Sequence, residues 1–335
     1  MTKNAAKVAG LWLCLSFSLA VAATASAETV RIAGNFVPEH SSSIAIQQFK
    51  QDVEKATNGE LIVQVFDNMQ LGGAQENVSQ VRAGTIMMTW VGMAYLTGTV
   101  PELEAVSLPF LFPSREVAYQ IMDGPIGQVF ATKLAEKGFE LLGFMELGER
   151  QVTNSVRPLK TMADLQGLKI RLQPNETHLA TFRALGANPL AMDIREVYSA
   201  LEQGVIDGQE NPFNLIYASR FFEVQKYVSN TGHFFDFIAV VANKEKFDEL
   251  SPDYQQAIKT AMQSAVQSQR IAAATADEEA LAEIQRQGLQ YDELPLAERQ
   301  AMRDASADVI NQIRERVGGD LVDRVLEEVS KASGS

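Results

Sequence analysis

Short apolar runs typical of strands alternate with longer runs that have helical spacing over the first 150 residues. The strand-like runs alternate apolar and polar residues or stay apolar for five or six positions, whereas the helix-like runs repeat apolar residues every three or four positions. This βαβ order predicts a mostly parallel sheet covered by helices. The strand-like runs are 29–33, 61–66, 86–91 and 139–145, and the helix-like runs are 41–56, 77–83, 115–122 and 126–137.

Residues 164–214 repeat the same alternation and predict a second α/β unit. Apolar and charged residues alternate over 168–172, a helix is predicted at 176–185, and a second short strand at 189–192. Asp193 is suited to cap the helix that follows, because its carboxylate can accept from free backbone N–H groups of the first turn. Ligands of such units lie beyond the carboxyl ends of the strands. Two further strand-like runs are 227–230 and 237–242.

The longest helical pattern extends over 251–287 without a breaker. Ser251 and Pro252 form a typical helix start, and Gly288 follows its end. About 36 residues at about 1.5 Å each give roughly 50 Å, which exceeds the width of a single domain of this size. We therefore expect the helix to contact two domains. A projecting coiled-coil arm is the alternative, although the alanine-rich stripe lacks the large residues such a seam needs.

The N-terminus has the pattern of a secretory signal peptide. Lys3 and Lys7 precede an apolar run at 8–23, and Ala25-Ser26-Ala27 forms a small-residue cleavage site. Cleavage is predicted after Ala27, and a retained N-terminal anchor is the alternative. The one cysteine, Cys14, lies in the discarded segment, so the mature chain can form neither a disulfide nor a thiolate metal site.

Charge and missing motifs narrow the function classes. The net charge is −13, and loss of Lys3 and Lys7 with the signal peptide makes it −15. A chain this acidic is unsuited to nucleic acids or anionic membranes, so an anionic ligand would need local arginines. The chain has no G-x-S-x-G, H-E-x-x-H, G-x-G-x-x-G or Walker motif. We expect no catalytic residue, metal ligand or cofactor, while a hard cation such as Ca²⁺ bridging protein and ligand stays open.

Arg171 is the charged residue that stands out in the second unit, because it lies in an otherwise apolar strand. Its planar guanidinium suits a carboxylate, which can accept two parallel charge-assisted hydrogen bonds. A strand-edge arginine paired with a surface acid explains the same residue equally well. Spacing alone does not decide between these two roles.

Several ordered motifs resemble the periplasmic solute-binding proteins of TRAP transporters, the DctP-type receptors for organic acids. The motifs are GLKIR, FRALGANP and EVYSALEQGVIDGQENP, flanked by NMQLGG, LPFLF, RQVTNS and FFEVQKY, and the resemblance covers residue 30 to about residue 299. It implies a two-domain α/β fold of the class II periplasmic-binding type, with the cleft between the domains. Crossings are expected near Gly148 and Asp236. The expected division is a signal peptide at 1–27, a first domain at 28–148 plus about 237–270, and a second at 149–236 plus about 271–330.

The same resemblance implies the ligand contacts. Arg171 corresponds to the family's carboxylate-binding arginine, and Arg150 to a second anion contact, with an ion pair to Glu146 or Glu149 as the alternative. Asn211 corresponds to a polar ligand contact whose amide can donate and accept. Asn35 matches a pocket position of the family. Trp90, His40, His233 and Asp236 are further candidate contacts from their places near the predicted cleft, with core packing of Trp90 and a structural role of each histidine as the alternatives.

The expected function is therefore capture of a small carboxylate, either a sugar acid or a C4-dicarboxylate, by hinge closure in the periplasm. The acidic and histidine side chains near the cleft favour a hydroxylated acid. The resemblance implies delivery to a TRAP permease in the membrane by a monomeric protein that is itself not membrane-embedded. A ligand sensor for a receptor domain and a periplasmic hydrolase are the alternatives, and the hydrolase would need a nucleophile–base pair in the cleft.

Overall fold

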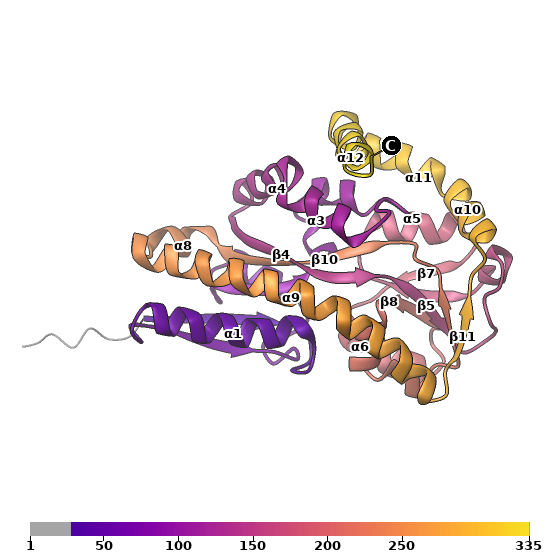
Figure 1. Cartoon of the computed structure of the whole chain (residues 1–335), viewed down its shortest axis with the longest axis horizontal. Coiled ribbons are helices and arrows are strands. Elements are labelled where there is room, and N and C mark those ends of the chain that lie inside the picture. The colour runs from indigo at the N-terminus through magenta and orange to yellow at the C-terminus, as the bar shows by residue number, and fades with distance from the viewer. Residues whose placement is uncertain (1–27, 335) are drawn as a thin grey trace, which may run out of the picture.

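The computed structural model describes residues 28–334, so the predicted signal peptide lies outside the described residues. Two separate sheets form its framework (Figure 1). In the first sheet the strands at 61–66, 28–34 and 88–92 pair in parallel, but the strand at 235–243 is antiparallel to both of its neighbours, so the sheet is mixed rather than mostly parallel. Its strands, in spatial order, are β2 (Leu61–Phe66), β1 (Glu28–Gly34), β3 (Met88–Gly92), β10 (Phe235–Asn243) and β4 (Phe139–Glu149).

The second sheet is also mixed and contains three strands that the sequence did not predict, at 151–154, 208–211 and 290–293. The first two have the polar sequences Gln-Val-Thr-Asn and Gly-Gln-Glu-Asn, although every residue of both is buried. The third has the sequence Gln-Tyr-Asp-Glu and lies at the sheet edge, where most side chains are exposed, so it too carries no strand-like apolar pattern. In spatial order the strands are β11 (Gln290–Glu293), β9 (Tyr227–Asn230), β5 (Gln151–Asn154), β8 (Gly208–Asn211), β6 (Lys169–Leu172) and β7 (Asn188–Ala191).

Helices cover both sheets, and the predicted ones lie within a few residues of their observed bounds. They are α1 (Ser41–Ala56), α2 (Ala74–Arg82), α3 (Arg115–Asp123), α4 (Pro125–Glu136), α5 (Glu176–Ala184), α6 (Ile194–Glu202), α7 (Phe213–Ala218), α8 (Lys244–Glu249), α9 (Pro252–Arg286), α10 (Leu296–Ala305), α11 (Ala307–Val317) and α12 (Gly319–Ala332). Short 3₁₀ helices are η1 (Met93–Leu96), η2 (Pro101–Val106), η3 (Met162–Leu165) and η4 (Phe221–Glu223).

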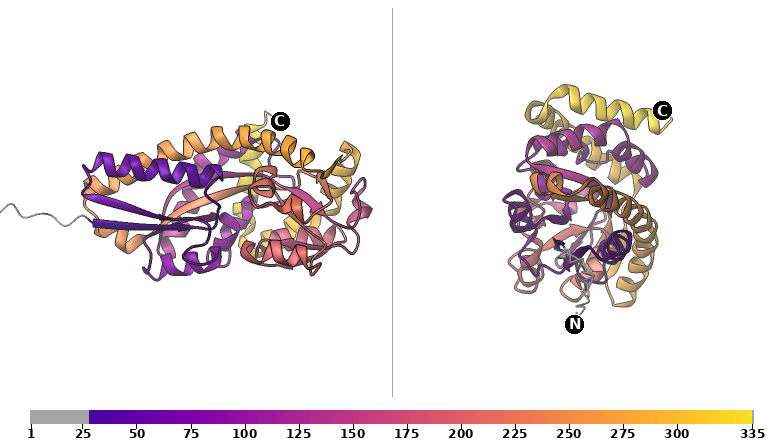
Figure 2. Two further views of the ribbon diagram at one scale, coloured as in Figure 1. Left: turned by 90° about the horizontal axis from the view of Figure 1, so that it is seen from below. Right: turned by 90° about the vertical axis from the view of Figure 1, so that its left-hand side faces the viewer.

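The long helix α9 is continuous over 35 residues and extends along both sheets (Figures 1 and 2). Its first half packs on α1 and β4, where Met262 is buried in the core under the first sheet. Its second half packs on α7, and Ile284 is buried in a core under the second sheet. At the middle, the buried Gln269 donates to the Glu146 carbonyl at 2.8 Å. The expectation of a helix spanning both units is confirmed, and the coiled-coil arm is excluded.

The chain passes between the sheets at two adjacent places. β4 ends at Glu149 and β5 begins at Gln151, while β10 follows β9 after four residues. The Arg150 backbone N–H donates to the Phe234 carbonyl at 2.8 Å and ties the two crossings together. Gly148 has a φ of +122°, which strongly favours glycine at the bend. A few residues at such paired crossings can change their backbone angles and so allow one domain to rotate relative to the other.

The last two helices pack against the first unit, unlike the predicted division of the chain. Val309, Val322 and Val325 are buried in the same core as residues of η2, α3 and α4, and Arg316 pairs with Glu104 at 3.0 Å. The valine stripe of α12 explains this, because it needs an apolar partner and α3 presents one. Residues 307–332 therefore lie with the first sheet rather than the second. The other predicted domain bounds stay a prediction.

Candidate ligand-binding site

A narrow cavity lies between the two sheets, at the carboxyl ends of four strands. Its volume is only about 10 Å³, room for roughly one water molecule, so the two units are closed over it in this conformation. This is the position at which open α/β sheets bind ligands. The lining residues are Asn35 and Phe36 after β1, Gly92 and Tyr95 after β3, Leu147 in β4, Arg171 and Gln173 at the end of β6, Ile194 at the start of α6, Asn211 ending β8, and Leu215 in α7.

Arg171 contributes a buried guanidinium with an unused amino group. Its Nε and Nη2 donate to the Met192 carbonyl at 2.9 and 2.7 Å, and Nη2 also donates to the Tyr95 hydroxyl at 3.1 Å. The Nη1 group has no hydrogen-bond partner, and no carboxylate in residues 28–334 forms an ion pair with this arginine. A buried charge without a counter-ion is costly, so the site favours an anionic ligand at Nη1.

Arg150 is equally buried but is surrounded by acids of the chain itself. Its Nε and Nη2 contact the Glu210 carboxylate, with Nη2 at 2.7 Å from Oε1, and Nη2 also donates to Asn211 Oδ1 at 2.9 Å. Its Nη1 lies 3.4 Å from Asp236 Oδ2. The partner is therefore neither of the two acids considered from the sequence, and Arg150 does not line the cavity.

The pKa values of the acids around Arg150 follow from burial and charge. Burial raises the pKa of Glu210, but the charge and hydrogen bonds of Arg150 outweigh this effect and hold the pKa below its usual range. Burial also raises the pKa of Asp236, and there the charge of Arg150, whose Nη1 lies 3.4 Å from Oδ2, offsets the effect of burial only in part. Glu210 therefore neutralises Arg150 throughout the neutral range, whereas Arg171 has no carboxylate partner among residues 28–334.

The asparagines predicted from the sequence both line the cavity. Asn35 is 7% exposed, and its Oδ1 has no hydrogen-bond partner within residues 28–334. Asn211 accepts from Arg150 and donates to Gln209. Asn35 can therefore accept from a ligand directly, while Asn211 is held in place by its neighbours.

The other four predicted contacts lie around the cavity without lining it. Trp90 is fully buried in the core of the first sheet, so close to Gly34 that a Cβ there would be 2.4 Å from its ring. His233 and Asp236 belong to the network around Arg150, since His233 Nε2 lies 3.1 Å from Glu210 Oε2. His40 caps α1 through its Nδ1 and stacks on Phe36 at 4.6 Å.

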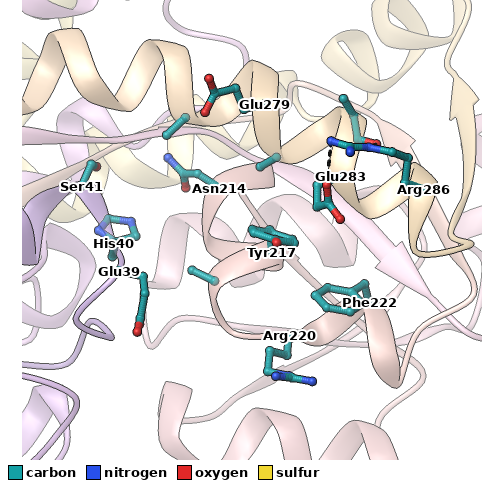
Figure 3. Close-up of a pocket in the computed structure, with 14 residues that line it drawn as sticks. Glu39, His40, Ser41, Asn214, Tyr217, Arg220, Phe222, Glu279, Glu283 and Arg286 are labelled. Carbon is teal, nitrogen blue, oxygen red and sulfur yellow. Dashed lines mark hydrogen bonds and ion pairs between the residues drawn. The ribbon is translucent and has the colours of Figure 1, made fainter.

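His40 instead lines a larger groove, which lies beneath the second half of α9 (Figure 3). About 1540 Å³ of it is not filled by atoms, and it is open to solvent. Arg286 pairs with Glu283 at 2.6 Å, whereas Glu39 and Glu279 form no ion pair with any of residues 28–334. The groove is therefore acidic and unsuited to an anion, despite its size. Side chains of Asn214, Tyr217, Arg220 and Phe222 form its other wall.

Sequence reasoning missed Tyr95, Gln173 and Glu210. Gln173 follows the strand that carries Arg171 and donates to Asp236 Oδ2 at 2.8 Å, so the strand-end rule could have found it. Glu210 precedes Asn211 in the motif already singled out. Tyr95 lies in a largely apolar stretch and shows no signal in the sequence, because only the tertiary packing brings its hydroxyl to Arg171.

Comparison with known proteins agrees with this geometry. The chain belongs to the bacterial extracellular solute-binding proteins, family 7 (DctP), which match residues 33–316, and it is a solute-binding protein of the TRAP class. It is 40% identical to the 2,3-diketo-L-gulonate-binding periplasmic protein YiaO of Escherichia coli over 78% of each chain. It is 30% identical to the C4-dicarboxylate-binding periplasmic protein DctP of Rhodobacter capsulatus over 92% of this chain and 93% of that protein.

Solved structures give the same fold. The sugar acid binding protein DctPAm of Advenella mimigardefordensis, in complex with galactonate, superposes with a TM-score of 0.89 at 31% identity, covering 91% of this chain and 98% of that one. A TRAP solute-binding protein of Sulfurospirillum deleyianum with bound succinate has a TM-score of 0.86 at 29% identity, covering 90% and 98%. The two-domain periplasmic binding fold is thus established for this chain.

Within residues 28–334 no helix is long and apolar enough to cross a bilayer. The same residues contain no group of three or more acidic, histidine or cysteine side chains placed to hold a metal ion.

Proposed function

We propose that this protein captures a sugar acid with a single carboxylate between its two domains, and that Arg171 binds that carboxylate. The observation that carries the proposal is the unpartnered, fully buried Nη1 of Arg171 in the cavity at the strand ends. A carboxylate there gains charge-assisted hydrogen bonds, which contribute about 1.5–3 kcal/mol each in proteins.

The charges around the cavity favour one carboxylate over two. Arg150 is already neutralised by Glu210, so a second ligand carboxylate would face no free cation. The other polar side chains of the lining are three amides, from Asn35, Gln173 and Asn211, and the hydroxyl of Tyr95. Amides and hydroxyls donate to and accept from the hydroxyl groups of a sugar acid, and they give no charge that would hold a second carboxylate.

The relatives support a sugar acid as well. The E. coli relative is named for a keto sugar acid, and structural neighbours were solved with galactonate, D-erythronate and D-glucuronate. Succinate and C4-dicarboxylates appear among the relatives too, so the comparisons alone do not choose. The charge balance at Arg150 and Arg171 supports the monocarboxylate.

Ligand binding requires the domains to separate. Arg171 is fully buried and Asn211 is 1% exposed, so solvent reaches neither in this conformation. The crossings between β4 and β5 and between β9 and β10 provide the hinge. We infer that the closed, ligand-bound form is presented in the periplasm to a TRAP permease.

The observed lining gives no support to a hydrolase. No serine, threonine, cysteine or histidine is among the cavity residues within 28–334, so the pair of nucleophile and base that hydrolysis needs is missing there. A sensor that presents its closed form to a receptor would use the same site, and no feature of the structure favours it over transport.

Calorimetric titration of the mature protein with D-galactonate, D-glucuronate and succinate tests the proposal. Either sugar acid should bind more tightly than succinate, and its binding should raise the midpoint of thermal unfolding, because the ligand binds only the folded state. Succinate binding more tightly than both sugar acids would contradict the single-carboxylate proposal. Binding of none of the three would contradict the assignment of a carboxylate ligand.

A further inference from the structure

The hydroxyl of Tyr95 lies where the ligand carboxylate should bind, and it comes from the opposite side of the cavity from Arg171. Tyr95 belongs to η1, which follows the first-sheet strand β3, whereas Arg171 ends β6 in the second sheet. The tyrosine is 3% exposed, and its ring packs in the core under the first sheet. Its position is therefore fixed by apolar packing, and only the hydroxyl reaches the cavity.

Arg171 donates hydrogen bonds to residues 28–334 from Nε and Nη2 but not from Nη1. The edge of the guanidinium formed by Nε and Nη2 is taken by the Met192 carbonyl, and the second Nη2 hydrogen goes to Tyr95. A carboxylate cannot use both hydrogens of the usual bidentate pair without displacing one of these partners. The free hydrogens are those of Nη1.

The hydroxyl of Tyr95 accepts hydrogen bonds from the protein but keeps its own proton free to donate. A phenolic oxygen accepts up to two hydrogen bonds and donates one. Here it accepts from Arg171 Nη2, and the Ile194 backbone N–H also faces it. Among residues 28–334 this hydroxyl donates no hydrogen bond, so its proton is free for a ligand.

We propose that Tyr95 is a direct ligand contact that completes the carboxylate site, an inference that rests on the proposed function. One carboxylate oxygen accepts from Arg171 Nη1, and the other accepts the Tyr95 O–H. The tyrosine thus replaces the second arm of the guanidinium. Because its hydroxyl comes from the first sheet and Nη1 from the second, both bonds form only when the domains close.

Tyr95→Phe tests this inference, because it removes the hydroxyl and keeps the ring. A lost hydrogen bond to a charged group should weaken binding of D-galactonate or D-glucuronate by about tenfold to a hundredfold in calorimetric titration. The matched control is Tyr217→Phe, whose exposed hydroxyl lies in the acidic groove. It should change the affinity by less than about twofold, the scale of ordinary surface substitutions.

Combining Tyr95→Phe with Arg171→Lys distinguishes a tyrosine that contacts the ligand directly from one that only positions Arg171. If Tyr95 only orients Arg171, Tyr95→Phe should have no further effect in the Arg171→Lys background. A direct contact should still lower affinity there by several-fold. Wild-type affinity in Tyr95→Phe, or loss of its effect in the Arg171→Lys background, would overturn the inference while leaving the proposed function intact. A wild-type protein that binds neither sugar acid nor succinate would overturn both.

Discussion

Two fully buried arginines at neighbouring strand ends differ in what surrounds them. Arg150, at the crossing between β4 and β5, contacts Glu210, Asn211 and Asp236. Arg171, near the end of β6, donates only to the Met192 carbonyl and the Tyr95 hydroxyl among residues 28–334. The first charge is balanced within the fold, and the second is not. A buried arginine therefore indicates a ligand only when its own chain supplies no counter-ion.

The difference assigns separate roles to the two residues. Arg150 joins the crossing strands to β8, so it stabilises the hinge region. Arg171 lines the cavity and keeps a free donor for a carboxylate. Substitution of Arg150 should therefore mainly lower stability, whereas substitution of Arg171 should mainly lower ligand affinity.

Arg150→Met should destabilise the protein most. It leaves Glu210 buried without its cation, and breaking a buried pair in this way costs about 3–5 kcal/mol. Urea unfolding followed by circular dichroism measures the change. The double variant Arg150→Met with Glu210→Gln should recover part of the loss, because the uncompensated charge is then gone. Equal stability of Arg150→Met and wild type would mean that the network does not hold the hinge.

Arg171→Lys should weaken ligand binding without unfolding the protein. Lysine keeps the charge but not the planar group, and the loss of one charge-assisted bond corresponds to roughly 10- to 100-fold in affinity. Arg171→Ala should be weaker still, because closure would bury the carboxylate without a cation. Calorimetric titration measures both, with circular dichroism as the folding control. A folded Arg171→Lys variant with wild-type affinity would exclude this residue as the anchor.

Stability should fall as the pH drops below about 6.5, the usual histidine value. Burial lowers the pKa of His178 to about 3 and that of His40 to about 4. The unfolded chain then binds protons that the folded chain does not, so stability is full above pH 6.5 and declines as the pH falls toward those values.

Replacing one of these histidines should show whether it causes the decline. His178 stacks on Phe234 at 4.1 Å, so His178→Phe should reduce the slope of stability against pH between about 6.5 and 4. Urea midpoints at several pH values measure it. A slope unchanged by His178→Phe would assign the decline to other groups. Because no histidine lines the cavity within residues 28–334, the carboxylate contact itself should be insensitive to these protonations.

Arg195→Gln should have the smallest effect. Its guanidinium lies 3.4 Å from Glu76 across the two units, and both side chains are more than half exposed. Exposed pairs of this kind contribute about 0–1 kcal/mol and weaken in salt. Ligand affinity should therefore change by less than about fivefold, and less at high ionic strength. A larger loss would mean that this pair, and not the buried site, controls closure.

The sequence predicted the parts of the fold that local patterns determine. Apolar periodicity placed the long helix, because the alanine-rich stripe and the Ser251 cap act within the helix itself. It missed β5, β8 and β11, whose largely polar sequences carry no strand pattern. It also misplaced α11 and α12, whose partners are distant in the chain. The positions of edge strands and terminal helices depend on surfaces formed elsewhere.

The same limit applies to the site. Arg171, Asn211 and Asn35 follow strands and were predicted to be ligand contacts from a family resemblance, and the structure brings all three to one cavity. The sequence could not show that Arg150 is neutralised while Arg171 is free to bind a ligand, because the partner of Arg150, Glu210, is 60 residues away in the chain. Trp90 and His40 are conspicuous residue types, but their surroundings are the core and the groove.

A crystal structure of the protein with a bound sugar acid tests the central claim most directly. The account predicts one carboxylate oxygen within about 2.7–2.9 Å of Arg171 Nη1, with the pairing of Arg150 and Glu210 unchanged. A carboxylate bound to Arg150 in place of Glu210, or a ligand in the groove beneath α9, would contradict it.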